Sequence, residues 1–226
     1  MLSQRPLHPA LVKNRELFAD FDQGRPLNRY NFVVCDTELT GLNKRKDEII
    51  SIGAVRIVNL QIALEQTFHK YVRPIDITPN KATLIHRITP EQLKKSASME
   101  EVLPEFIDFC GNSLLVGHFI GLDMHFFDKV ARDVLGGILS NPVIDTMRLA
   151  RRYKENRIID FYGHNDQVVS YNLDVLTEEF NLPRFNPHDA LEDALQAAYL
   201  FLYLMKKFQN GGITSLKALY RAGRLR

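Results

Sequence analysis

The sequence predicts a single α/β domain built on a mixed five-stranded sheet flanked by helices. Near the start of the chain, three segments rich in β-forming residues follow one another through short connections, which predicts an antiparallel meander. Further along, short apolar runs alternate with amphipathic segments, which predicts strands separated by helices. A chain of 226 residues with 45% hydrophobic content is long enough to bury one substantial core.

Each predicted strand is a short apolar or alternating segment bounded by turn-forming residues. The first contains the buried-type run Phe32–Cys35, and the second carries β-branched residues on both faces. The last two are brief apolar runs that precede helical segments. The predicted strands are Asn31–Glu38, Glu48–Val58, Gln66–Arg73, Ser113–His118 and Val143–Thr146.

The predicted helices combine apolar residues at helical spacing with capping residues. Thr89 followed by Pro90 is typical of a helix start, and glycines follow two amphipathic segments, 98–110 and 122–135, as C-caps. The longest predicted helix is 188–208, which Gly211 and Gly212 end. Shorter helices are expected at 16–19, 147–153, 173–180 and 215–222, with a surface loop at 155–170.

Composition argues against a secreted or membrane-spanning protein, but it does not identify a binding partner. The formal net charge is only +2, yet the chain from Lys206 onward has six basic residues and no acidic one. A polyanion or a solvated helix would account equally well for this basic segment. The N-terminus lacks the apolar core of a signal peptide, and no apolar run is long enough to span a bilayer. Cys35 and Cys110 have no partner at metal-site spacing, so reduced thiols and a cytoplasmic location are expected.

We therefore expect three parts. Residues 1–29 form an N-terminal extension that either lies on the domain or binds a partner. Residues 30–210 form the domain, and 211–226 form a basic C-terminal tail.

Two carboxylates at the end of the first predicted strand are the leading functional candidates. Asp36 and Glu38 are two residues apart, so in a strand their side chains point to the same side. Two like charges in a small region repel unless a cation neutralises them or one is protonated. Oxygen ligands favour a hard divalent ion such as Mg²⁺ or Mn²⁺. Taken alone the pattern is common and favours a solvated Glu38 beside a turn-capping Asp36, and only the rest of the chain shifts the balance toward a metal site.

Acidic residues also follow the fourth and fifth predicted strands. Gly117 and Gly121 allow a tight loop that brings Asp123 to the end of the fourth strand, although Asp123 could simply complement a helix dipole. His118 in the same loop is expected to be a buried histidine with hydrogen-bond partners and no metal. Asp145 is expected to position the helix that follows it.

The spacing His188-x-x-x-x-Asp193 opens the longest predicted helix. Asp189 and Glu192 are three residues apart at this helix start, so they are interpreted as an N-cap and its reciprocal N3 partner. That leaves Asp193 inside the first turns and His188 just outside the helix. A histidine there could act as a general base, because its unperturbed pKa lies near neutral pH, or it could be an ordinary surface residue.

Together these residues resemble the DnaQ-like 3′–5′ exonucleases of the DEDDh class, over about residues 30–208. Three motifs carry the resemblance: Asp36-Thr37-Glu38-Leu39-Thr40-Gly41-Leu42, Gly117-His118 through Asp123 with Phe126, and His188-Asp189-Ala190 through Asp193. Two further segments are similar, His86-Arg87-Ile88-Thr89-Pro90-Glu91 and Asp145-Thr146 with Leu149-Ala150-Arg151. The histidine, in place of a tyrosine, is what places the chain in the DEDDh branch.

The resemblance implies a ribonuclease H-like fold, two divalent cations and release of nucleoside 5′-monophosphates. Asp36, Glu38 and Asp193 would hold one cation, Asp36 and Asp123 the other, and His188 would accept a proton from the attacking water. The remaining residues implied to contact substrate are Thr40 and Gly41 through their backbone, Leu42 as a wedge, His86 at the terminal nucleotide and Phe126 near its base. The chain departs from the family at Phe119, where asparagine is usual, and at Leu39.

Three functions remain open on the sequence alone. The first is a 3′–5′ exonuclease on single-stranded or frayed DNA ends, in proofreading or repair. The second is an exonuclease that trims RNA or short oligonucleotides, since recognition of the 2′-OH depends on pocket geometry. The third is a non-catalytic, polymerase-associated subunit that binds nucleic acid. A proofreading role would need a DNA polymerase as partner, and no membrane association is expected.

Overall fold

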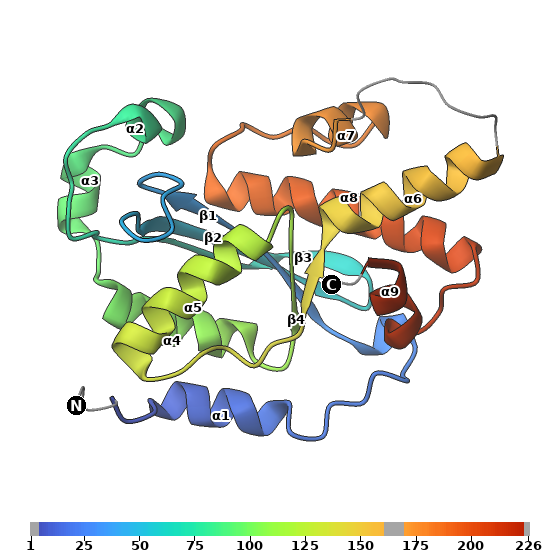
Figure 1. The fold of residues 1–226 in the computed structure, drawn as a ribbon, viewed down its shortest axis with the longest axis horizontal. Helices are drawn as coiled ribbons and strands as arrows, with labels where there is room; N and C mark the ends of the chain where they lie inside the picture. The colour runs from blue at the N-terminus through green and yellow to red at the C-terminus, as the bar shows by residue number, and fades with distance from the viewer. Residues whose placement is uncertain (1–4, 161–169, 224–226) are drawn as a thin grey trace.

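The structure is a computed structural model that describes residues 5–160 and 170–223. Its centre is a five-stranded sheet in the order β3-β2-β1-β4-β5 (Figure 1). β1 pairs antiparallel with β2, and β2 with β3, whereas β1–β4 and β4–β5 are parallel pairs. The predicted mixed sheet with an N-terminal meander is therefore confirmed. The strands are β1 Phe32–Leu39, β2 Ile49–Val58, β3 Gln61–Tyr71, β4 Leu114–Gly117 and β5 Val143–Asp145.

Helices cover both faces of this sheet, as Figure 1 shows. α1, α4 and α5 pack on the face that receives Val33 and Cys35, while α6, α7 and α8 pack on the face that receives Phe32 and Val34. The helices are α1 Pro9–Leu17, α2 Lys81–His86, α3 Pro90–Lys95, α4 Met99–Cys110, α5 Gly121–Leu135, α6 Thr146–Asp160, α7 Leu173–Glu179, α8 Ala190–Asn210 and α9 Leu216–Gly223, with a 3₁₀ turn at Leu27–Arg29. None of the helices in the described ranges is long and apolar enough to cross a membrane.

Alternation along β1 sets the direction of the candidate side chains. Because successive residues of a strand face opposite sides, Asp36 and Glu38 share the α8 face of the sheet. Thr37 points to the opposite face, toward α5. The end of β1 therefore supplies polar groups to both helical layers.

Most helix boundaries agree with the predictions. Thr89 caps α3 with Pro90 in its first turn, Gly111 ends α4 and Gly136 ends α5 in a left-handed conformation. α8 is the longest helix of the described chain, at 21 residues. Cys35 and Cys110 are buried free thiols, as predicted.

Three of the predicted segments have other bounds than expected. α1 begins at Pro9, earlier than the predicted start at residue 16, because the side chain of His8 caps it and Pro9 occupies the first turn. β3 begins at Gln61 and not at Gln66, because Asn59 and Leu60 both adopt positive φ (51° and 59°) and form a tight hairpin turn.

The third difference concerns the predicted loop at 155–170. α6 continues to Asp160, and an ion pair between Arg151 and Glu155 at 3.1 Å, one turn apart, supports the extra helical turn. The rest of the predicted loop, 161–169, lies outside the described residues.

Both flanking segments lie against the sheet domain. α1 contacts α4, and Asn14 Nδ2 donates a buried hydrogen bond of 2.7 Å to Asn141 Oδ1. At the opposite end, the Leu27 amide donates to the carbonyl of Thr214, and α9 contacts α6. Of the two possibilities for the N-terminal extension, its described part lies on the domain.

Candidate active site

Three elements bring four carboxylates together at the end of β1. Asp36 and Glu38 come from β1, Asp123 from the first turn of α5 and Asp193 from the first turn of α8. Burial, and then the negative charges of Asp123, Asp193 and Glu38, raise the pKa of Asp36, as expected where these groups lie close together. The structure therefore gathers residues that the sequence separates by more than 150 positions.

A glycine that the sequence analysis did not single out permits this convergence. Gly53 on β2 pairs with Asp36 on β1, and a Cβ atom at Gly53 would lie 2.0 Å from the carbonyl carbon of Ala190. The first turn of α8 therefore rests directly on the backbone of β2, which no larger residue would allow. The signal was present in the sequence, because a glycine inside a β-branched strand often marks the close approach of another backbone.

A second unanticipated contact fixes Asp123. Thr37 Oγ1 donates a buried hydrogen bond of 2.5 Å to Asp123 Oδ1. This bond crosses from β1 to α5 and holds the carboxylate beside the strand that carries Asp36 and Glu38. Thr37 thus acts as a positioning residue for Asp123.

The electrostatics of the cluster are those of carboxylates without a counterion. Burial, followed by the charges of Asp123, Asp193 and Glu38, raises the pKa of Asp36 well above its usual range. Burial is also the main cause that raises the pKa of Glu38 to about 8, of Asp123 to about 7 and of Asp193 to about 6. In the part of the chain that the structure describes, none of the four forms an ion pair with a lysine or arginine.

These donors fit a divalent cation. Ligand atoms of Glu38, His188 and Asp193 lie within 4.8 Å of one another, and the rest of the cluster is made of carboxylate oxygens. Hard cations such as Mg²⁺ and Mn²⁺ prefer oxygen ligands, and a bound cation would offset the cost of burying these negative groups together. The site can therefore hold metal, although the geometry does not choose the ion.

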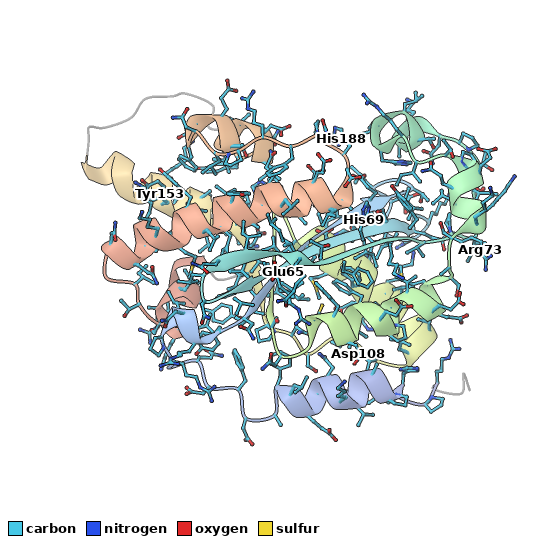
Figure 2. The ribbon with its side chains drawn as sticks, turned by 180° about the vertical axis from the view of Figure 1, so that it is seen from behind. Glu65, His69, Arg73, Asp108, Tyr153 and His188 are labelled. Carbon is cyan, nitrogen blue, oxygen red and sulfur yellow. The ribbon has the colours of Figure 1, made fainter. Side chains whose placement is uncertain are left out.

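His188 lies on a sharp turn immediately before α8. Its φ of 67° is in the left-handed region, and its backbone amide donates to Asp193 Oδ2 at 2.9 Å. The side chain is exposed, and Figure 2 shows it on the loop between α7 and α8, next to α2. A left-handed backbone is costly for a non-glycine residue, so this turn is held in place by its surroundings.

Asp189 caps α8 as predicted, but Glu192 does not complete a capping box. Asp189 Oδ1 accepts from the amides of Leu191 and Glu192 at 3.0 and 3.1 Å. The predicted reciprocal bond from Glu192 is wrong, because its carboxylate accepts from the backbone and side chain of Asn186. The turn at His188 brings the preceding loop back over the first turn of α8, where Asn186 meets Glu192.

The predicted substrate-contacting residues Thr40, Gly41 and Leu42 lie on the loop after β1. Thr40 Oγ1 donates to Asp47 at 3.0 Å, and its carbonyl accepts from Asn80 Nδ2 at 2.8 Å. A Cβ at Gly41 would lie 2.5 Å from Asp47 Oδ2, so the loop is tightly packed there. Leu42 is 75% exposed, which leaves most of its side chain available to a ligand.

His86 ends α2, a helix that the sequence analysis did not predict. Asn80 and Thr83 form a capping box at its start, which was the missed signal. The imidazole is mostly buried, and its Nδ1 accepts from the Ile88 amide at 3.0 Å. Burial and the charge of His188 lower the pKa of His86, so the two histidines lie near each other.

Phe126 differs from the exposed Leu42 of the loop after β1. Its side chain is 2% exposed and belongs to the core beneath α5. Little of its surface remains for contact with a nucleotide, unlike that of Leu42.

His118 and Asp145 form a second polar group next to the carboxylates. His118 Nδ1 bonds Thr146 Oγ1 at 2.8 Å and Nε2 bonds the Tyr171 carbonyl at 2.7 Å, while burial lowers its pKa to about 4. The predicted hydrogen bonding of this histidine is confirmed, although its side chain is only partly buried. Asp145 Oδ1 accepts from the amides of Met147 and Phe119, so it does position the start of α6. Phe119 has a φ of 56°, a conformation that asparagine adopts more readily than phenylalanine.

Comparison with known proteins agrees with this geometry. The model of a family described as an exonuclease matches residues 33–201. The chain is 37% identical over 188 residues to a PolC-type DNA polymerase III of Thermotoga petrophila, covering 83% of this chain and 13% of that protein. It is 33% identical over 192 residues to the DNA polymerase III subunit epsilon of Aquifex aeolicus, covering 83% of this chain and 89% of that subunit.

A solved structure shows the same fold. Exonuclease X in complex with 5′ overhanging duplex DNA superposes with a TM-score of 0.61 at 25% identity, covering 85% of this chain and 99% of that one. The chain spans only about an eighth of the PolC-type relative. The fold is ribonuclease H-like, and the chain belongs to the DnaQ-like (DEDDh) exonuclease family.

Proposed function

We propose that this protein is a metal-dependent 3′–5′ exonuclease that acts on single-stranded or frayed DNA ends and releases nucleoside 5′-monophosphates. The observation that carries the proposal is that four carboxylates gather at the end of β1 with no lysine or arginine partner among the described residues, two of them, Glu38 and Asp193, beside His188. A structural cluster would bring in a lysine or arginine to neutralise these charges. A nuclease site would instead leave them for cations and phosphate.

In this proposal Asp36, Glu38, Asp123 and Asp193 hold two divalent cations, Mg²⁺ or Mn²⁺. Two such ions, when bound, lower the pKa of an attacking water and stabilise the leaving oxygen. His188 accepts the proton of that water. A ring nitrogen of its exposed side chain lies within 4.8 Å of carboxylate oxygens of Glu38 and Asp193, while the bond from its amide to Asp193 fixes its backbone.

The substrate would contact the loop after β1 and the end of α2. The exposed Leu42 wedges between the last nucleotides, and the braced backbone of Thr40 and Gly41 supports the terminal nucleotide. His86 contacts the same nucleotide from the opposite side. Phe126 contributes from beneath the site by shaping its floor, since most of its surface is buried.

The preference for DNA follows the relatives. Exonuclease X was solved with a DNA duplex, and the Aquifex relative is named as a DNA polymerase III subunit. By the same analogy we propose association with a DNA polymerase. Co-purification of the full chain with a polymerase from its source cells tests that association.

A time course on a 5′-labelled single-stranded DNA and a matched RNA tests the activity. With Mg²⁺ or Mn²⁺ we expect a ladder of products on DNA that shorten one nucleotide at a time. The ladder should disappear in EDTA and in the His188→Ala variant. If neither strand is degraded under any metal, the proposal is wrong; if only RNA is degraded, its substrate is wrong.

A further inference from the structure

A groove rich in basic residues lies along α5, the helix that carries Asp123 in its first turn. Its volume is about 500 Å³, and it lies between the loop that joins β1 to β2 and the exposed face of α5. Asp133 is the one acidic residue in its lining. The basic groove is lined by Lys44, Arg45, His125, Lys129, Arg132 and Asp133.

Three of these basic residues lie on one face of α5. His125, Lys129 and Arg132 are spaced by four and three residues, so they form one stripe on that helix. Asp123 lies in the first turn of α5, on the buried side, and at 1.5 Å per residue the stripe extends along the axis to about 13 Å from it on the opposite, outer side. Lys44 and Arg45 follow Leu42, the exposed residue of the substrate loop, by two and three residues.

Hydrogen bonds hold the two walls of the groove together. Lys129 Nζ donates to the carbonyls of Arg45 and Asp47, both at 3.1 Å, and so ties the loop to α5. The carboxylate of Asp47 in turn accepts from Thr40 Oγ1 and from the Asn43 amide. The loop that carries Lys44 and Arg45 is therefore braced at both ends beside the stripe.

The positive charge of the groove is only partly neutralised. Arg132 pairs with Asp128 at 3.6 Å. Lys44 and Arg45 are exposed and form no ion pair with any residue in the described ranges. With a net charge of only +2 over the whole chain, such a concentration of cations is a local feature. Unpaired cations next to a nuclease site attract the phosphates of its substrate.

We infer that the basic groove binds the backbone phosphates of the strand that leads into the site, upstream of the 3′-terminal nucleotides. This inference rests on the proposed function, and it assigns the upstream part of a long substrate to the groove. Contacts of this kind position a strand without reading its sequence. The groove would therefore raise affinity for long ends while leaving the chemical step to the carboxylates.

Hydrolysis of substrates of two lengths tests this role. The Lys44→Glu/Arg45→Glu variant should lose about tenfold or more in kcat/KM on a long oligothymidylate at low salt, mainly through KM, if each phosphate contact contributes about 1 kcal/mol. The p-nitrophenyl ester of thymidine 5′-monophosphate is too short to reach the groove, so its hydrolysis should be unchanged. The salt dependence of kcat/KM on the long strand should become shallower by about 1.4 in log–log slope for two lost contacts.

A matched variant controls for net charge. Lys206→Glu/Lys217→Glu makes the same charge change at exposed positions near α9, at the opposite end of β1 (Figure 1). It should hydrolyse the oligothymidylate as the unaltered protein does. Equal losses in both variants, an unchanged groove variant, or an equal loss on the ester would overturn the inference.

Binding without hydrolysis separates this inference from the proposed function. In EDTA, fluorescence anisotropy of a labelled oligothymidylate should show weaker binding by the groove variant than by the control. If the unaltered protein hydrolyses neither substrate, the proposed function fails, but this measurement still tests whether the groove binds the strand. Equal affinity of all three proteins would overturn the groove inference and leave the proposed function standing.

Discussion

Two polar regions lie side by side at the same edge of the sheet, and they differ in how their charges are satisfied. In the region of His118, Asp145 and Thr146, each imidazole nitrogen has a partner and the Asp145 carboxylate accepts two amide hydrogen bonds. In the cluster of Asp36, Glu38, Asp123 and Asp193, negative groups face one another and several pKa values rise. Residue types and strand-end positions are similar in both.

The difference separates a structural network from a functional one. Buried polar groups with complete hydrogen bonding stabilise a fold, whereas buried like charges cost free energy until a ligand neutralises them. A protein keeps such a cluster where the ligand matters. His118 and His188 differ in the same way, since the first is partly buried with both ring nitrogens hydrogen-bonded, and the second is exposed beside the carboxylates.

The largest effect on activity should come from removing one carboxylate charge from the cluster. Asp36→Asn should lower kcat/KM on single-stranded DNA by about 10³-fold or more, equivalent to about 4 kcal/mol in the barrier. The free energy of unfolding of the metal-free protein should not fall, because a repelling charge is lost. Steady-state kinetics and urea unfolding measure the two quantities.

Asp145→Asn is the matched control for Asp36→Asn. It keeps one oxygen to accept from the amides of Met147 and Phe119, so its main effect should be a loss of about 1 kcal/mol in unfolding free energy. An Asp36→Asn variant that keeps full activity, or an Asp145→Asn variant that loses as much activity, would remove the distinction between the two regions.

The two histidines should differ in the same way as the two aspartates, with a smaller loss of activity. His188→Gln should lower kcat by about 10²- to 10³-fold, the usual contribution of a general base, with little change in stability. His118→Gln should instead lower the unfolding free energy by about 1–3 kcal/mol, because a buried partner of Thr146 or of the Tyr171 carbonyl is lost. The pH dependence of kcat and urea unfolding of both variants separate these outcomes. Equal stability losses in the two variants would contradict the assignment.

Much of the fold and the identity of the site residues could be predicted from the sequence. The β1 pattern, with buried residues up to Cys35 and then Asp36 and Glu38, encodes both strand and site, and capping residues such as Thr89 and Asp189 encode helix starts. The turn at Asn59-Leu60 was missed because Leu60 is not a residue that usually adopts positive φ. Local sequence patterns predict local conformation, so they fail where tertiary contacts determine the conformation.

The parts of the site that could not be predicted all depend on contacts between distant segments. The contact of Gly53 with Ala190 joins positions far apart in the chain, and so does the Thr37–Asp123 hydrogen bond. Glu192 has the correct spacing for a capping box, but its carboxylate accepts a hydrogen bond from the amide of Asn186 instead. Spacing gives the candidates for a bond, and tertiary geometry decides among them.

Gly53→Ala tests whether α8 must touch the sheet to complete the cluster. An added Cβ would overlap the backbone of Ala190, so the first turn of α8 should shift away from β1 together with Asp193. Such overpacking typically costs about 1–3 kcal/mol in stability. We expect kcat/KM to fall by about tenfold or more, the equivalent of about 1.4 kcal/mol.

Gly121→Ala provides the control for this substitution. Gly121 opens α5 close to Asp123, but a Cβ there would have no heavy atom within 4 Å. Thermal unfolding and kinetics should therefore change little. If Gly53→Ala is equally harmless, then contact between α8 and β2 does not position the site.

The smallest expected effect is a dependence of metal-free stability on pH. The folded-state pKa values of Glu38, Asp123 and Asp193 lie at about 8, 7 and 6, above their ordinary values of 4.5, 3.8 and 3.8. The folded protein therefore binds extra protons, and the stability that they contribute is complete below about pH 4 and lost as pH rises through about 6 to 8. His118 has the opposite sign, since its contribution is complete above 6.5 and lost as pH falls toward about 4.

Between pH 6.5 and about 8 the carboxylate contribution changes while that of His118 does not. Burial raises the pKa values of Cys35 and Cys110 above their ordinary value of 9.0, so these thiols affect stability only at higher pH and the window isolates the cluster. In EDTA, Tm should fall by a few degrees between about pH 6.5 and 8, because each kcal/mol corresponds to about 2–4 °C in a chain of this size. Mn²⁺ should restore Tm most at the alkaline end, where the carboxylates are ionised and bind it best. Glu38→Gln should flatten the slope in EDTA. A metal-free Tm that rises over this window would mean that another group neutralises the cluster, and the contrast with the His118 region would lose its physical basis.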